Sequence, residues 1–74
     1  MTEPITFELR GEHITLDALL KANGLAGSGG AAKMLIAEGN VRVNGEAEAR
    51  RGRKLRAGDQ VALGEVRIHV QAAA

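Results

Sequence analysis

The stretch 28–45 constrains the fold of this chain more than any other. Apolar residues recur at helical spacing between positions 29 and 38, and Gly39 supplies a helix stop. Residues 41–43 then alternate between apolar and polar side chains, and Asn44-Gly45 is typical of a two-residue type I′ hairpin turn. The sequence therefore predicts a short helix that leads directly into a small antiparallel sheet.

Ser28 opens the predicted helix. Its hydroxyl can accept a hydrogen bond from a first-turn N–H group, while Gly29 and Gly30 place no side chain in front of the remaining donors. Free N–H groups and the positive end of the helix dipole favour a phosphate at such a position. Lys33 lies one turn further along, on the side away from the apolar residues. We interpret this helix end as an anion-binding site, with an ordinary N-cap as the alternative.

A basic run follows the predicted hairpin. Residues 1–48 contain four cations and seven acids, whereas residues 49–74 contain six cations and two acids. Five of these six cations lie within seven residues with no acid between them, and such a block repels itself unless an anion is nearby. The run lacks strand alternation and contains a glycine, so we expect a loop that Leu55 anchors to the core. We predict that phosphates bind through Ser28, Gly29, Gly30, Lys33, Arg50, Arg51, Arg53, Lys54 and Arg56.

Period-two alternation of apolar and polar residues predicts the remaining strands. It occurs at residues 5–9, 60–63 and 66–70, and residues 46–48 are expected to return from the hairpin turn. Gly64-Glu65 suits a two-residue II′ turn between the last two strands. Arg42 and Arg67 are expected to be solvent-facing strand residues.

A first helix is predicted over residues 16–23. Thr15 is the expected N-cap, leucines recur at helical spacing, and Gly24 supplies the left-handed residue that ends the helix. Met34 lies off the apolar stripe of the second helix, where we expect a half-buried packing role. Residues 71–74 are expected to form a frayed tail.

Composition limits the possible classes of function. The 74 residues fit one small domain, and the absence of cysteine excludes disulfides, thiolate zinc ligands and a cysteine nucleophile. His13 and His69 lie far apart with no further ligand at useful spacing, and no Ser-His-acid or paired-carboxylate arrangement stands out. We therefore expect no metal site, no cofactor and no enzyme activity. Because neither a signal-peptide pattern nor a membrane-spanning apolar run is present, we expect a cytoplasmic protein.

The middle of the chain resembles the S4 RNA-binding domain, which is also called the αL motif. The resemblance covers about residues 14–63, and the Ser28 step with the basic run is similar to small stand-alone bacterial S4-like proteins. It rests on Leu16-Asp17-x-x-Leu20, Gly24, Ser28, Ala32, Leu35-Ile36, Gly39-x-Val41-x-Val43-Asn44-Gly45, Lys54 and Gly58-Asp59-x-Val61. It implies an α+β fold with two short helices packed on a small, mostly antiparallel sheet. It also implies that RNA is held across the second helix and the following loop, without catalysis.

One departure from the S4 pattern affects the expected site. Many S4 domains carry a basic residue directly after the serine that opens the second helix, whereas this chain has Gly29. The expected phosphate contacts therefore shift to backbone N–H groups, Lys33 and the basic run.

We interpret residues 1–74 as a single domain that binds structured RNA, with ribosomal RNA or a ribosomal particle as the expected partner and a monomer as the expected state. Phosphates would carry most of the binding, because Phe7 is the one aromatic residue and recognition by base stacking needs more. Two alternatives stay open. One is a module that docks an acidic protein through the basic run, and the other is a β-grasp sulfur carrier, although no Gly-Gly lies near the end of the chain.

Overall fold

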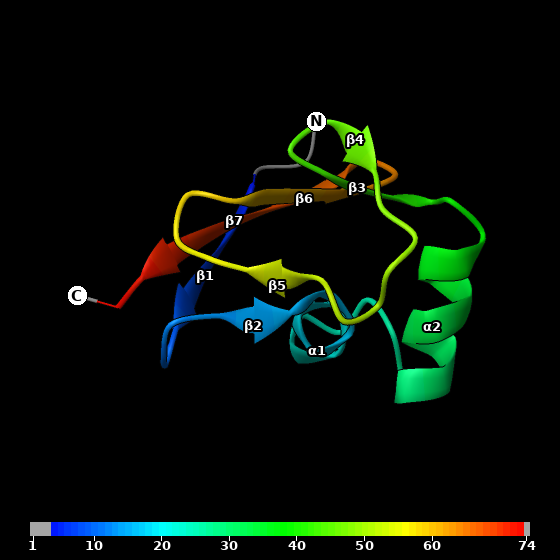
Figure 1. The fold of residues 1–74 in the computed structure, drawn as a ribbon, viewed down its shortest axis with the longest axis horizontal. Coiled ribbons are helices and arrows are strands. Elements are labelled where there is room, and N and C mark those ends of the chain that lie inside the picture. Colours follow the sequence, from blue (N-terminus) through cyan, green and yellow to red (C-terminus); the bar gives the residue numbers. More distant parts are fainter. Residues whose placement is uncertain (1–3, 74) are drawn as a thin grey trace.

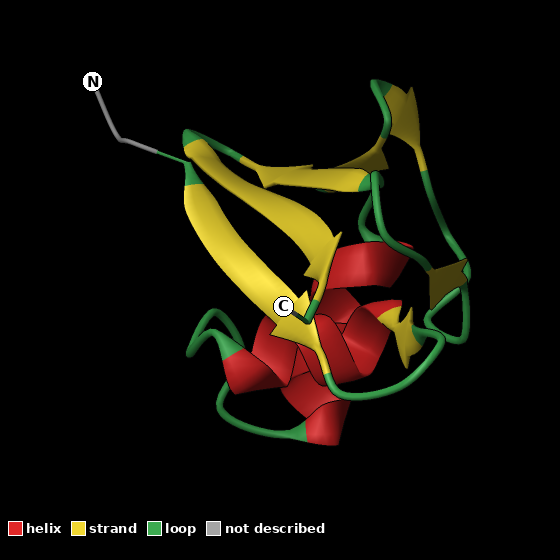
Figure 2. Ribbon diagram, turned by 90° about the vertical axis from the view of Figure 1, so that its left-hand side faces the viewer, coloured by secondary structure: helices red, strands yellow, loops and turns green. Residues whose placement is uncertain are grey.

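The computed structural model describes residues 4–73, which form a sheet layer and a helix layer (Figure 1). In chain order the elements are β1 (Ile5–Leu9), β2 (Ile14–Thr15), α1 (Leu16–Ala22), α2 (Gly29–Ala37), β3 (Val41–Val43), β4 (Glu46–Ala47), β5 (Lys54–Leu55), β6 (Gln60–Leu63) and β7 (Val66–Ala72). The larger sheet has five strands in the order β1-β7-β6-β3-β4, and β2 pairs with β5 in a second, two-stranded sheet. Both helices lie on the same side of the larger sheet (Figure 2).

The larger sheet is mixed. Every neighbouring pair in it is antiparallel except β1 and β7, which run parallel. The prediction of two short helices on a small, mostly antiparallel sheet is therefore confirmed. The predicted frayed tail is wrong for Gln71 and Ala72, because Glu8 and Leu9 of β1 pair with these two residues and extend β7. Ala74 lies outside the described residues.

The core lies between the sheet and the helices. Leu16, Leu19 and Leu20 of α1 are fully buried, as the leucine spacing predicted. The other core side chains come from the inner sheet face, from α2 and from β5, and include Val41, Val61, Ile68, Val70, Ala32, Ile36 and Leu55. Buried and exposed residues alternate along β3, so one face of the sheet packs on the helices and the other faces away from them.

Two turns of the sheet are joined by side chains. Asn44 and Gly45 have φ angles of 51° and 86°, as the predicted type I′ turn requires. The Asn44 amide group also donates to the Asp59 carboxylate (3.0 Å), and its Oδ1 accepts from the Gln60 N–H (2.9 Å). The hairpin between β3 and β4 is thereby fixed to the turn that precedes β6.

Candidate functional site

The N-terminus of α2 has the predicted cap. Ser28 has an extended backbone, with φ −159° and ψ 169°, and its Oγ accepts a hydrogen bond from the Ala31 N–H at 3.1 Å. The Ser28 carbonyl accepts from the Ala32 N–H at 3.0 Å. Within residues 4–73, the N–H groups of Gly29 and Gly30 have no acceptor. Two donors are therefore uncovered at the positive end of the helix.

Neither glycine of this first turn is required by the fold. A Cβ at Gly29 would meet no atom within 4 Å, and one at Gly30 would meet only the Ser28 Oγ at 3.9 Å. Neither residue has a positive φ angle. A helical glycine is usually less stable than alanine, so these two residues have no packing or backbone explanation. Their effect is to leave the two N–H groups accessible.

The exposed side of α2 carries one cation and one large apolar residue. Lys33 is exposed and makes no ion pair with the residues that the structure describes. Met34 is 65% exposed, so the prediction of a half-buried packing role is wrong. The buried residues of α2 are Ala32 and Ile36, and Met34 lies between them in sequence but points away from the core. Both Lys33 and Met34 are therefore accessible to a partner.

Residues 50–56, here called the arginine loop, are only partly a loop. Lys54 and Leu55 form β5, which pairs with Ile14 and Thr15 of β2, so the prediction of a continuous loop is wrong at these two positions. Leu55 is fully buried and anchors the segment, as predicted. The missed strand has only two residues, which is too short for period-two alternation to reveal.

The backbone of the arginine loop caps α1. The carbonyl groups of Arg53 and Arg51 accept from the N–H groups of Leu16 (2.9 Å) and Asp17 (3.0 Å). Thr15 occupies the N-cap position, but its side chain makes no capping hydrogen bond, so the predicted role of that hydroxyl is wrong. Instead, a hydrogen bond from the Thr15 side chain holds the pKa of Asp17 below its usual range. The first turn of α1 is thus closed to an external anion, whereas that of α2 is open.

A buried carboxylate organises two of the arginines. Glu48 is only 7% exposed and lies two residues before the first residue of the arginine loop. Its Oε2 accepts from the Arg50 backbone N–H (3.2 Å) and Nε (3.0 Å), and its Oε1 accepts from Arg50 Nη2 (3.2 Å) and Arg53 Nη1 (2.7 Å). Hydrogen bonds from Arg50 and then from Arg53 lower the pKa of Glu48 to about 2. Glu48 therefore stays ionised at neutral pH.

Glu48 is absent from the predicted site residues because the predicted basic run begins at Arg50, two residues after it. The five loop cations indeed have no acid among them, yet an anion that pairs with two of them lies two positions before Arg50. The Arg50 side chain is still 74% exposed and that of Arg53 is 34% exposed. The other three loop cations are exposed and make no ion pair within residues 4–73: Arg51, Lys54 and Arg56. All five cations thus retain donors that can reach a ligand.

The helix end and the arginine loop are both held by α1. The arginine loop caps the first turn of α1, and α1 packs against α2. In Figure 1 the loop segment before β5 and the whole of α2 lie in the right-hand half of the molecule. The predicted site residues therefore come from two segments that each contact α1.

Comparison with known proteins identifies the family. The S4 domain profile matches residues 7–71. This chain belongs to the S4 domain family. The S4-like fold expected from the resemblance is thereby confirmed, and the β-grasp carrier alternative is wrong.

Two curated relatives of this S4 domain are of similar length. The chain is 44% identical over 63 residues to the "Probable ribosome maturation protein RlbA" of Bacillus subtilis strain 168, covering 85% of this chain and 86% of that protein. It is 41% identical over 68 residues to the "Putative RNA-binding protein YbcJ" of Escherichia coli strain K12, covering 90% and 97%. The solution structure of E. coli YbcJ, described as revealing an αL motif involved in RNA binding, matches with a TM-score of 0.73 and 40% identity, covering 97% of this chain and 92% of that one.

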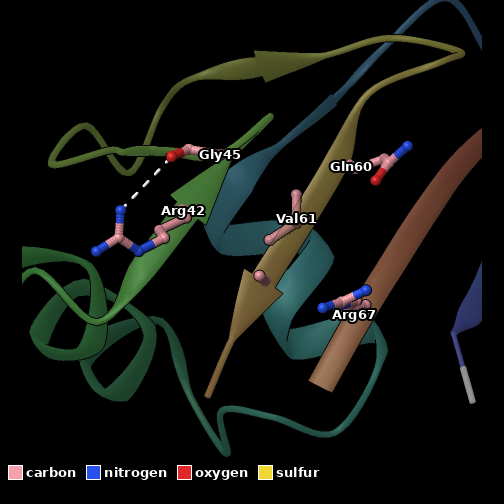
Figure 3. A pocket seen from close by; sticks show the side chains of 6 residues that line it. Arg42, Gly45, Gln60, Val61 and Arg67 are labelled. Carbon is pink, nitrogen blue, oxygen red and sulfur yellow. Dashed lines mark hydrogen bonds between the residues drawn. The ribbon is translucent and has the colours of Figure 1, made fainter. Parts of the chain in front are cut away.

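The face of the S4 domain sheet that points away from the helices carries a second pair of cations. Arg42, Ala62 and Arg67 form one row across β3, β6 and β7. A shallow hollow of about 230 Å³ lies over the small Ala62, between the two exposed arginines (Figure 3). Arg42 Nη1 donates to the Gly45 carbonyl at 3.5 Å. Both arginines face solvent, as predicted, and lie apart from the arginine loop.

The described residues offer no arrangement for a metal ion. Within residues 4–73, no three His, Cys, Asp or Glu side chains come together in a way that could hold one. The helices of this S4 domain are also short: none that the structure describes has the length and apolar character needed to cross a membrane.

Proposed function

We propose that this protein binds structured RNA through its phosphates, with ribosomal RNA or a ribosomal particle as the partner, and that it does so as a cytoplasmic monomer without catalysis. The names of its relatives support this proposal, since one names a ribosome maturation protein and the other an RNA-binding protein. The αL motif of the YbcJ structure, described as involved in RNA binding, supports it as well.

The observation that carries the proposal is that two segments able to bind anions are both connected to α1. The uncovered N–H groups of Gly29 and Gly30 lie at the first turn of α2, and the arginine loop caps the helix that packs against α2. Phosphate oxygens accept hydrogen bonds from both kinds of donor. An RNA backbone presents several phosphates in succession, so it can occupy both features at once.

The lysine and arginine side chains of the proposed site contact phosphate in different ways. Lys33 is a flexible point charge beside the helix end, whereas an arginine can donate two parallel hydrogen bonds to one phosphate. The phosphates of the RNA backbone are assigned to Arg50, Arg51, Arg53 and Lys54. Arg56 lies at the margin of the proposed site. Phe7 is half-buried, and the chain has no other aromatic residue, so base stacking contributes little. We therefore infer recognition of RNA shape and phosphates, with little base readout.

A salt titration tests the proposal. If the site neutralises roughly four to six phosphates, the logarithm of the binding constant falls with the logarithm of salt concentration with a slope of about −3 to −5. The measurement is the affinity for a structured RNA, such as a ribosomal RNA hairpin, at several salt concentrations. A flat salt response would rule out the phosphate site. Binding to an acidic protein that RNA cannot displace would instead favour a protein-docking module.

A further inference from the structure

The arginine loop occupies all the acceptor sites of the Glu48 carboxylate. Its two oxygens accept four hydrogen bonds, three from Arg50 and one from Arg53. Its own N–H donates to the Val41 carbonyl at 3.0 Å, so the residue is fixed to β3. We infer that Glu48 is a positioning residue for the RNA site, which holds the guanidinium groups of Arg50 and Arg53 in a binding orientation before RNA arrives. This inference rests on the proposed function.

The contacts leave specific donors free for a phosphate. Glu48 uses Nε and Nη2 of Arg50 and Nη1 of Arg53. The donors that remain are both N–H groups of Nη1 and the second N–H of Nη2 in Arg50, and Nε–H, both N–H groups of Nη2 and the second N–H of Nη1 in Arg53. The side chain of Arg50 is 74% exposed although it is held at its inner edge. Each guanidinium group therefore has one edge on Glu48 and another edge available to a ligand.

Two physical effects of Glu48 oppose each other. Its negative charge reduces the attraction between the arginine loop and an anion. Its hydrogen bonds also restrict two long side chains, so less conformational freedom remains to be lost on binding. A charge count alone predicts that removing Glu48 strengthens RNA binding. Positioning predicts the opposite sign.

Two neutralising variants separate these effects. Glu48→Gln and Glu46→Gln change the net charge equally, but Glu46 is exposed and makes no side-chain hydrogen bond within residues 4–73. We expect Glu48→Gln to bind structured RNA about 3–10-fold more weakly than the wild type, because the two arginines lose their fixed orientation. We expect Glu46→Gln to bind at least as tightly as the wild type. Equal or tighter binding by folded Glu48→Gln would overturn the inference.

A readout without RNA keeps the inference separate from the proposed function. The Nε–H groups of Arg50 and Arg53 can be followed by NMR, and we expect Glu48→Gln to increase the mobility of both side chains and the solvent exchange of their protons. Unchanged arginine signals would overturn the positioning role. If the wild type shows no RNA binding, the proposed function fails, while the NMR comparison still reports on the arginines.

Glu48→Asp is the second variant in case Glu48→Gln does not fold. It keeps the charge but shortens the side chain by one methylene, so the carboxylate cannot hold both arginines in the present geometry. We expect weaker RNA binding by about two- to fivefold at unchanged net charge. Wild-type affinity for Glu48→Asp, with the arginine signals also unchanged, would overturn the inference.

Discussion

The backbone carbonyl of Arg51 accepts a hydrogen bond from the N–H of Asp17 at 3.0 Å. This contact joins the start of the arginine loop to the first turn of α1, and the hydrogen bond from the Leu16 N–H to the Arg53 carbonyl adds a second connection at the centre of the loop. The loop backbone is thus held against the helix, while Arg51 itself is exposed. The position of the cations is therefore set by the helix that also supports α2.

The cations of the arginine loop should dominate the salt dependence of RNA binding. Arg51 and Lys54 are the best probes, because neither forms an ion pair with Glu48. We expect the double variant Arg51→Ala/Lys54→Ala to reduce the magnitude of the salt slope by roughly 1 for each lost phosphate contact. The matched control is Arg42→Ala/Arg67→Ala, which removes two exposed cations from the sheet face that points away from the helices. An equal loss of slope in the control would contradict the assigned site.

Substituting a glycine at the helix end should raise stability and lower RNA affinity. An added methyl group at Gly30 meets only the Ser28 Oγ at 3.9 Å. Because alanine restricts the unfolded chain, we expect Gly30→Ala to stabilise the fold by about 0.4–1 kcal/mol. We also expect RNA binding to weaken by about 1 kcal/mol, since the methyl group hinders one backbone contact to phosphate. Urea unfolding and RNA titration measure the two effects.

Gly39→Ala is the control for the glycine substitution. Gly39 has a φ of +80°, which strains any other residue, so we expect a loss of about 1 kcal/mol of stability. Unchanged RNA affinity of Gly30→Ala would argue that the two N–H groups are not used by RNA.

Glu48 should make the fold acid-sensitive. Its pKa falls from an ordinary 4.5 to about 2 in the folded state, so its stabilising effect is fully present above the unfolded pKa. That effect is lost as pH falls from about 4.5 to about 2, because protonation breaks the contacts to Arg50 and Arg53. Urea unfolding followed by circular dichroism at several pH values measures the loss. Glu48→Gln should lack this pH-dependent loss of stability, and Glu46→Gln should keep it. Parallel curves of stability against pH for the wild type and both variants would contradict the role of Glu48.

Two apolar residues with opposite exposure should differ sharply in their contribution to stability. Leu55 is fully buried, so Leu55→Ala should reduce the free energy of unfolding by about 2–5 kcal/mol and also loosen the arginine loop. Met34 is 65% exposed, so Met34→Ala should change stability by no more than about 0.5 kcal/mol. Circular dichroism is the suitable probe, since the chain has neither Trp nor Tyr. A large loss for Met34→Ala would show that its side chain packs on the fold.

Local chemistry made several features predictable. The Ser28 cap, the Asn44-Gly45 turn and the leucine stripe of α1 each depend on residues within one turn of one another. Leu55 could be predicted as an anchor because it is the one large apolar residue in a charged run. Such features follow from hydrogen bonding, backbone preference and spacing without knowledge of the rest of the chain.

Contacts distant in sequence were not predictable in the same way. Nothing local to Gln71 and Ala72 indicates that β1 pairs with them, and nothing local to Thr15 shows that loop carbonyls replace its hydroxyl as caps. Glu48 differs, because it is close in sequence to Arg50 and could have been found by extending the charge count by two residues. The assignment of individual residues to RNA contacts stays a prediction.

The parallel pairing of β1 with β7 has a consequence for the order of folding. Within residues 4–73, β7 is the only strand beside β1, and their register pairs Ile5 with Ile68, so β1 finds its neighbour only at a large separation in sequence. Helices α1 and α2 and the central hairpin can form earlier from nearby residues, whereas closure of the sheet requires contact between distant parts of the chain. The β1–β7 pairing is therefore the step of sheet formation that closes the largest loop of the chain, which makes it the slowest contact to form.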